Sequence, residues 1–138
     1  MVRKVLAAVA ALGAVLAISS PAIAHHSVTG IFMTDRAAEL EGQLTGVEWV
    51  NPHIYFAVSV KGADGTVSKW RFETLPPGFM RRAGLTKELF MDDGGKPIKI
   101  IFNPPRDPAN KTGYAMEVHY ADGHSYKLGG LRNQMGGR

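Results

Sequence analysis

Residues 40–60 read LEGQLTGVEWVNPHIYFAVSV, and this stretch decides the fold. Apolar side chains alternate along its first half, but the phase shifts by one position near Thr45 and Gly46. A glycine at such a shift indicates a β-bulge. The Asn-Pro-His triplet at 51–53 then predicts a tight corner, after which the alternation resumes. The stretch is therefore predicted to form a long, bent hairpin with one buried face.

The rest of the chain supplies the other elements of a small β-barrel. After a Gly-Ala-Asp-Gly turn, a third strand is predicted, with Trp70 and Phe72 pointing inward. In the fifth strand, Tyr114, Met116 and the apolar residues that follow at every second position are predicted to point inward. The predicted segments are strands at 67–74, 98–102, 114–120 and 124–128, and two helical turns at 79–83 and 86–91, separated by Gly84. Thr86 is the predicted N-cap of the second turn.

Three strands, a helical segment and further strands follow the order of the oligonucleotide/oligosaccharide-binding (OB) barrel. The chain is thus predicted to be all-β with one short helical segment, in an OB-like barrel of five to six strands over residues 40–128. An open β-sandwich of similar size is the alternative. The bulged first strand favours the barrel, because closing a barrel needs strong coiling.

The first 24 residues have the pattern of a secretory signal peptide. Arg3 and Lys4 precede an apolar run, and a small-residue site ending at Ala24 follows Pro21. A membrane anchor is the alternative, but the apolar run is short for a bilayer span. We expect a signal peptide at 1–24, an extended N-terminal arm at 25–39, the barrel at 40–128 and a flexible tail at 129–138, in a protein that is periplasmic or secreted. The apolar residues at 31–33 of the arm are candidates for packing on the barrel.

The composition of the mature chain excludes several classes of function. Loss of the leader removes two basic residues and leaves 14 basic and 12 acidic ones, a net charge of +2, so a nucleic-acid partner is not expected. The chain has no cysteine, which excludes thiol chemistry and disulfides. The sequence contains no nucleophile-elbow motif and no phosphate-binding glycine loop. These features favour a protein that is not an enzyme.

Two loops of the predicted barrel carry candidate ligand-binding residues. In an OB barrel the loops after the first and fourth strands rim the same end. Here they hold Asn51 and His53 on one side, and Asn103, Arg106 and Asp107 on the other. The functional interpretation is a small polar pocket with His53 and Arg106 at its mouth. The alternative is that each Asn-Pro pair serves only as turn chemistry and that His53 caps a strand edge.

Histidines at the expected mature N-terminus are candidate metal ligands. The free α-amino group and the imidazole of His25 can chelate one metal ion, and His26 or His53 would complete a nitrogen set that suits Cu(II). Adjacent histidines at a chain end are also common without any function. A second cluster, His119 and His124 with Glu117, is expected on the solvated side of the last hairpin.

Through three motifs the chain resembles a family of short exported bacterial proteins of unknown function. The motifs are AHHS at 24–27, WVNPH at 49–53 and RRAG at 81–84, and the resemblance covers roughly residues 25–128. It implies an exported small β-barrel without an established activity. The MDDGG segment at 91–95 is longer than the usual turn of that family, which affects where the fourth strand begins.

Together these features predict an exported, non-enzymatic module that binds a small ligand or a metal ion and has no membrane span once the signal is removed. One alternative is a copper-dependent accessory or electron-transfer protein that uses His25. The other is a structural subunit that docks on another exported protein by its barrel edge.

Overall fold

The computed structural model describes residues 27–92 and 94–129. The predicted signal peptide, His25, His26 and nearly all of the predicted tail therefore lie outside the described residues. In chain order the elements are α2 (Val28–Ile31), β1 (Ala38–Trp49), β2 (Ile54–Lys61), β3 (Val67–Thr74), α3 (Pro77–Arg82), α4 (Lys87–Asp92), β4 (Pro97–Asn103), β5 (Thr112–Tyr120) and β6 (Ser125–Lys127). Each predicted strand is present, although most are one or two residues longer or shorter than predicted.

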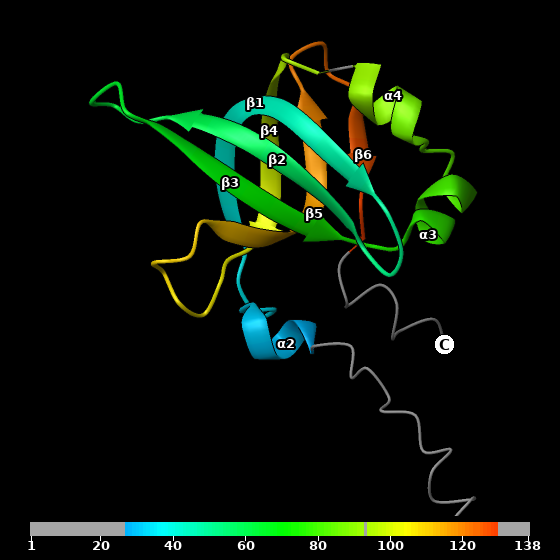
Figure 1. Ribbon diagram of the computed structural model, residues 1–138, viewed down its shortest axis with the longest axis horizontal. Coiled ribbons are helices and arrows are strands. Elements are labelled where there is room, and N and C mark those ends of the chain that lie inside the picture. Colours follow the sequence, from blue (N-terminus) through cyan, green and yellow to red (C-terminus); the bar gives the residue numbers. More distant parts are fainter. Residues whose placement is uncertain (1–26, 93, 130–138) are drawn as a thin grey trace, which may run out of the picture.

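The strands form one sheet that closes on itself (Figure 1). Their order is β3-β2-β1-β4-β5-β6, with antiparallel neighbours, and a parallel pairing between β3 and β5 closes the barrel. The five strands β1 to β5 make the barrel, and β6 is added beside β5. This topology, with α3 and α4 between β3 and β4, confirms the predicted OB-like barrel. No helix of the described ranges is long and apolar enough to cross a membrane.

Strand β1 is shared by both sides of the barrel because it bends. Its first half pairs with β4 and its second half with β2, and the two pairings meet at Gln43. Between Leu44 and Gly46 the register against β2 shifts, so that Thr45 is the extra residue of a bulge. The side chain of Thr45 donates to the carbonyl of Ala57 across this irregularity at 3.1 Å. The bulge expected from the glycine and the phase shift is therefore confirmed, and it supplies the coiling that closure requires.

The barrel interior is filled by apolar side chains that alternate along the strands as predicted. The ring of Phe72, which is fully buried, stacks on Phe56 at 5.3 Å and meets the ring of Phe102 edge-on at 5.1 Å between centroids. Trp70 also packs against this core but is only partly buried, so it sits at the margin rather than in the interior. The fully or nearly fully buried members of the core are Leu44, Ile54, Phe56, Val58, Phe72, Met80, Leu85, Phe90, Ile98, Ile100, Phe102, Ala115, Val118, Tyr120 and Leu128.

The two short helices cover one end of the barrel. Helix α3 ends before Gly84, which has a φ of +80° that glycine adopts without strain. The hydroxyl of Thr86 then accepts a bond from the backbone N–H of Leu89 at 3.3 Å, which confirms Thr86 as the N-cap of α4. Leu85 and Phe90 on either side of this cap are both buried in the core.

Two sequence-based predictions are corrected by the structure. The first concerns the start of β5: Tyr114 and Met116 were expected to point inward, but Gly113 and Ala115 take the inward positions. Met116 has no partner in the register of β5 against β4 and is therefore the extra residue of a bulge. The bulge shifts the alternation by one residue, so that inward and outward positions are exchanged on its N-terminal side. Tyr114 is buried all the same, because it lies under the N-terminal segment.

The second correction concerns residues 27–36, which were expected to be extended. Residues Val28–Ile31 form a single helical turn, and Phe32 after it is buried against the ring of Tyr114 at 6.0 Å. Phe32 also forms a bridge with Pro105. This segment therefore packs as a small second apolar cluster on the outside of the barrel. The contact of Phe32 with the barrel was suggested by the sequence, and only the extended conformation of residues 28–31 was wrong.

Candidate functional site

A buried carboxylate lies on the outward side of β3. Glu73 is only 5 % exposed, although it occupies the phase opposite to Phe72 and the barrel core. In the sheet register it lies between Tyr55 of β2 and Tyr114 of β5. The covering comes from these neighbours and from the corner that joins β1 and β2. A carboxylate at such a position has few routes to bulk water, and its interactions are correspondingly strong.

His53 is the partner of this carboxylate. Its Nδ1 contacts Oε1 of Glu73, and the two side chains are 16 % and 6 % exposed. His53 stands immediately before β2, in the corner that contains the cis peptide bond between Asn51 and Pro52. The backbone N–H of Ile54 donates to the carbonyl of Leu75 at 3.3 Å, which ties this corner to the end of β3. An imidazole held through Nδ1 by a carboxylate has a defined tautomer and ring orientation.

The two tyrosines beside Glu73 are held in their protonated form. Burial, together with the charge of Glu73, raises the pKa of Tyr114 to about 12. Burial and the same carboxylate also raise the pKa of Tyr55, against the opposing effect of Arg71. Both phenols therefore remain neutral well above physiological pH, and they border the carboxylate without adding negative charge to it.

The predicted residues of the loop between β4 and β5 have other partners. In Figure 1 this loop and the corner between β1 and β2 both lie at the lower end of the barrel. Asn103 is buried, and its side-chain amide donates to the carbonyl of Arg36 at 2.6 Å. Arg106 is directed to the N-terminal segment, where its Nε donates to the carbonyl of Thr29 at 2.9 Å. Asn103 and Arg106 thus hold residues 29–36 against the barrel.

The remaining loop residues, Asp107 and Asn51, are exposed. Asp107 organises its own loop: its carboxylate accepts from the backbone of Ala109 at 3.0 Å and from the side chain of Asn110 at 3.3 Å. Of the five predicted ligand-binding residues, His53 is the one that the structure brings into a pair with a buried charge.

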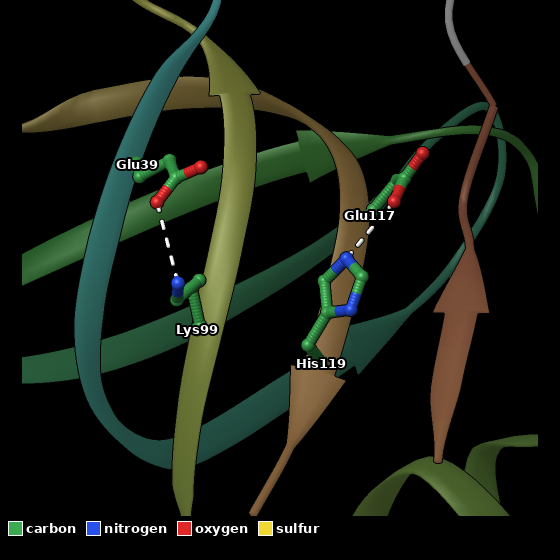
Figure 2. A network of polar contacts seen from close by, with 4 residues as sticks. All are labelled: Glu39, Lys99, Glu117 and His119. Carbon is green, nitrogen blue, oxygen red and sulfur yellow. Dashed lines mark hydrogen bonds and ion pairs between the residues drawn. The ribbon is translucent and has the colours of Figure 1, made fainter. Parts of the chain in front are cut away.

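The predicted cluster on the last hairpin does not gather on one face. His119 pairs with Glu117 at 2.9 Å on the outside of β5, beside the pair of Lys99 and Glu39 at 3.4 Å (Figure 2). His124 instead stacks on the ring of Tyr120 at 4.1 Å, and its Nδ1 contacts Asp122.

No group of three or more histidine, aspartate and glutamate residues that could hold a metal ion occurs within the described part of the chain. His25 and His26 lie outside it.

The importance of Glu73 was missed by sequence reasoning. In the predicted strand it falls on the outward phase, where charged side chains are ordinary. The available signal was the hairpin register: a turn centred on Asp64 pairs Tyr55 with Glu73 and brings His53 close to the same carboxylate. The burial of Glu73 and its neighbours, however, depends on the corner at 51–53 and on the N-terminal segment. No local sequence pattern indicates that these two segments pack there.

Fold and site together define a small OB-type β-barrel with a histidine–carboxylate pair at the end that carries the loops after β1 and β4. Residues 12–115 match the model of a family of unknown function, DUF6152, and the chain belongs to that family. The comparisons with curated proteins and with solved structures find no significant match. Membership of a family of unknown function is thereby confirmed, whereas the exported address stays a prediction.

Proposed function

We propose that this protein is an exported, non-enzymatic binding module whose binding site is centred on His53, and that the bound group is a metal ion, with Cu(II) as the best candidate. The observation that carries the proposal is the contact between Glu73 and Nδ1 of His53. Histidines that bind metals through one nitrogen usually have the other held by a carboxylate or a carbonyl. With Nδ1 engaged by Glu73, a metal ion would be coordinated through Nε2.

The further ligands in this proposal are the α-amino group and the imidazoles of His25 and His26. Nitrogen ligands of this kind suit Cu(II). The way the N-terminal segment is anchored supports their participation: Phe32 packs on Tyr114, Tyr114 is the register neighbour of Glu73, and Glu73 contacts His53. His26 precedes Phe32 by six residues in the sequence. Ser27 and the helical turn Val28–Ile31 lie between them, and Arg106 holds that turn to the barrel through the carbonyl of Thr29.

Competition titration of Cu(II) against a chelator of known affinity tests the proposal. Four proteins are compared: the processed form that begins at His25, the same chain with an initiator Met before His25, His53→Ala and His119→Ala. His119 is the matched control, because it also pairs with a carboxylate, Glu117, but on a different part of the barrel (Figure 2). The Met-extended protein and His53→Ala should each bind Cu(II) at least tenfold more weakly, and His119→Ala should bind as the parent does.

Glu73→Gln separates the role of the carboxylate from that of the ligand itself. Removing a carboxylate that orients a ligating histidine typically weakens metal binding by about 10- to 100-fold, so this variant should lie between the parent and His53→Ala. Binding should also weaken with acid, because protons compete for the amine and the imidazoles. Unchanged affinity in His53→Ala would restrict copper to a chelate of the terminal residues and would contradict a barrel-centred site. Equal affinity in all variants would remove the copper proposal entirely.

A further inference from the structure

A groove of about 260 Å³ lies on the outer face of β1, β2 and β3. Its floor includes Gly46 and Ala57, two small residues that pair across β1 and β2 beside the bulge. A Cβ added at Gly46 would meet no atom within 4 Å, so this part of the floor is open. The groove includes neither His53 nor Glu73, although Tyr55, the register neighbour of Glu73, contributes to its lining.

The side chains that rim the groove are mainly basic. Lys69 and Arg71 come from β3, Lys111 comes from the end of the loop between β4 and β5, and Glu48 of β1 is the single acidic side chain of the lining. In the ranges that the structure describes, no ion pair engages the ammonium groups of Lys69 and Lys111. The rim thus carries three positive charges against one negative charge, and it favours an anion.

Arg71 is positioned by its neighbours. Its guanidinium lies over the ring of Tyr55, with Cζ 3.8 Å from the ring centroid, and its Nη2 is 3.0 Å from Oε2 of Glu48. The backbone N–H of Arg71 donates to the carbonyl of Lys111 at 3.0 Å, and this bond holds the lysine beside it. A planar guanidinium placed in this way offers paired donors that match the oxygens of a carboxylate or a phosphate.

We propose that this groove binds a small organic anion, with its carboxylate or phosphate group at Arg71 and Lys111 and an apolar body on the floor of Gly46 and Ala57. The volume of about 260 Å³ is at the small end of ligand pockets, which suits a molecule with a single ring. The anion would displace Glu48 from Arg71. That exchange is easy because both side chains of the pair are more than half exposed, and exposed ion pairs hold weakly.

Amide chemical shifts of the purified protein provide a direct test, with benzoate, phenyl phosphate, acetate, inorganic phosphate and neutral benzyl alcohol as probes. Benzoate and phenyl phosphate should shift the amides of Gly46, Ala57 and Arg71 with dissociation constants of about a millimolar, as expected for ligands of this size. Acetate and inorganic phosphate should bind several-fold more weakly, because they lack the apolar body. Benzyl alcohol should not bind. A stronger response to benzoate than to phenyl phosphate would assign the anion as a carboxylate, and the reverse would assign it as a phosphate.

Charge-matched variants test the assignment of residues. Arg71→Gln should weaken binding of the preferred probe by about tenfold, whereas Lys87→Gln on α4 removes the same charge away from the groove and should have no effect. Glu48→Gln should bind two- to threefold more tightly, because the competing carboxylate is gone. Gly46→Leu should abolish binding by filling the floor without a change of charge.

Equal losses in Arg71→Gln and Lys87→Gln would show an unspecific response to net charge and would overturn the proposal. So would full binding by Gly46→Leu. Neither outcome depends on copper binding, so these experiments test the anion-binding proposal independently of the copper proposal for His53.

Discussion

Gly113 of β5 lies against the rings of Phe72 and Phe102, so close that a Cβ added at this glycine would come within 2.9 Å of Cε1 of Phe72 and closer still to Phe102. The two rings are in the middle of the barrel core. The close approach of β5 to β3 and β4 at this point is what allows the parallel pairing that closes the barrel.

Gly113→Ala should therefore destabilise the barrel. Fitting one methyl group here requires two packed rings to move, and overpacking of this kind costs about 1–3 kcal/mol of unfolding free energy. Gly46→Ala is the control, because a Cβ at Gly46 meets nothing within 4 Å and should change stability by less than about 0.5 kcal/mol. Urea denaturation of both variants measures the difference. Coincident unfolding midpoints would contradict the predicted clash.

Asn103→Ala should lower stability rather than ligand affinity. The buried amide of Asn103 donates to the carbonyl of Arg36 at 2.6 Å, and its loss leaves that carbonyl without this donor, at a cost of about 1–3 kcal/mol. Because the bond anchors the N-terminal segment, backbone amides of residues 29–36 should also exchange with solvent faster. Chemical denaturation and hydrogen exchange measure the two effects. A variant as stable as the parent but unable to bind ligand would return Asn103 to the predicted ligand set.

Tyr114 should make the fold sensitive to alkali. Its pKa is about 12 in the folded chain and near 10 when unfolded, so the folded state favours the protonated phenol. The stabilisation is fully present below pH 10 and is lost as the pH rises towards 12, with a size of roughly 2 kcal/mol. Tyr114→Phe has no phenol to ionise. The stability of the parent relative to this variant, from denaturation between pH 9 and 12, should fall across that range, and a constant difference would show that Tyr114 does not titrate abnormally.

Export should release a chain that begins at His25. The small-residue site at 22–24 follows Pro21 and the apolar run, which is the arrangement that signal peptidase recognises. The intact mass of material recovered from the periplasm measures the cleavage point. Any other first residue would contradict this prediction, and it would also remove the amine of His25 from the proposed copper site.

The strand pattern of the barrel could be read from the sequence because it depends on local alternation. The bulge at Thr45, the corner at 51–53, the third strand and the N-cap at Thr86 were all predicted. Each follows from a few adjacent residues whose backbone preferences and burial agree. The prediction of which β5 residues point inward was wrong at its start, because a second bulge lies at Met116. No glycine or other local sequence feature indicates that bulge.

The candidate site was predicted only in part, since it is assembled from distant segments. The sequence indicated His53 as a loop residue of interest, but its pairing with Glu73 results from the β2–β3 register and the fold of the corner. Arg106 has the charge expected of a ligand-end residue, yet the tertiary structure directs it to the N-terminal segment.

The sequence by itself determined the order of the strands and the positions of the helices along the chain. In strands with a clear alternation it also determined which residues point into the core. These features follow from periodicity and turn chemistry. Only the tertiary structure decided which outward-facing residues are covered. Glu73 and Tyr114 are buried on the outside of the barrel since the corner and the segment around Phe32 pack over them. Burial of that kind is a property of contacts between segments far apart in the chain, and no local pattern records it.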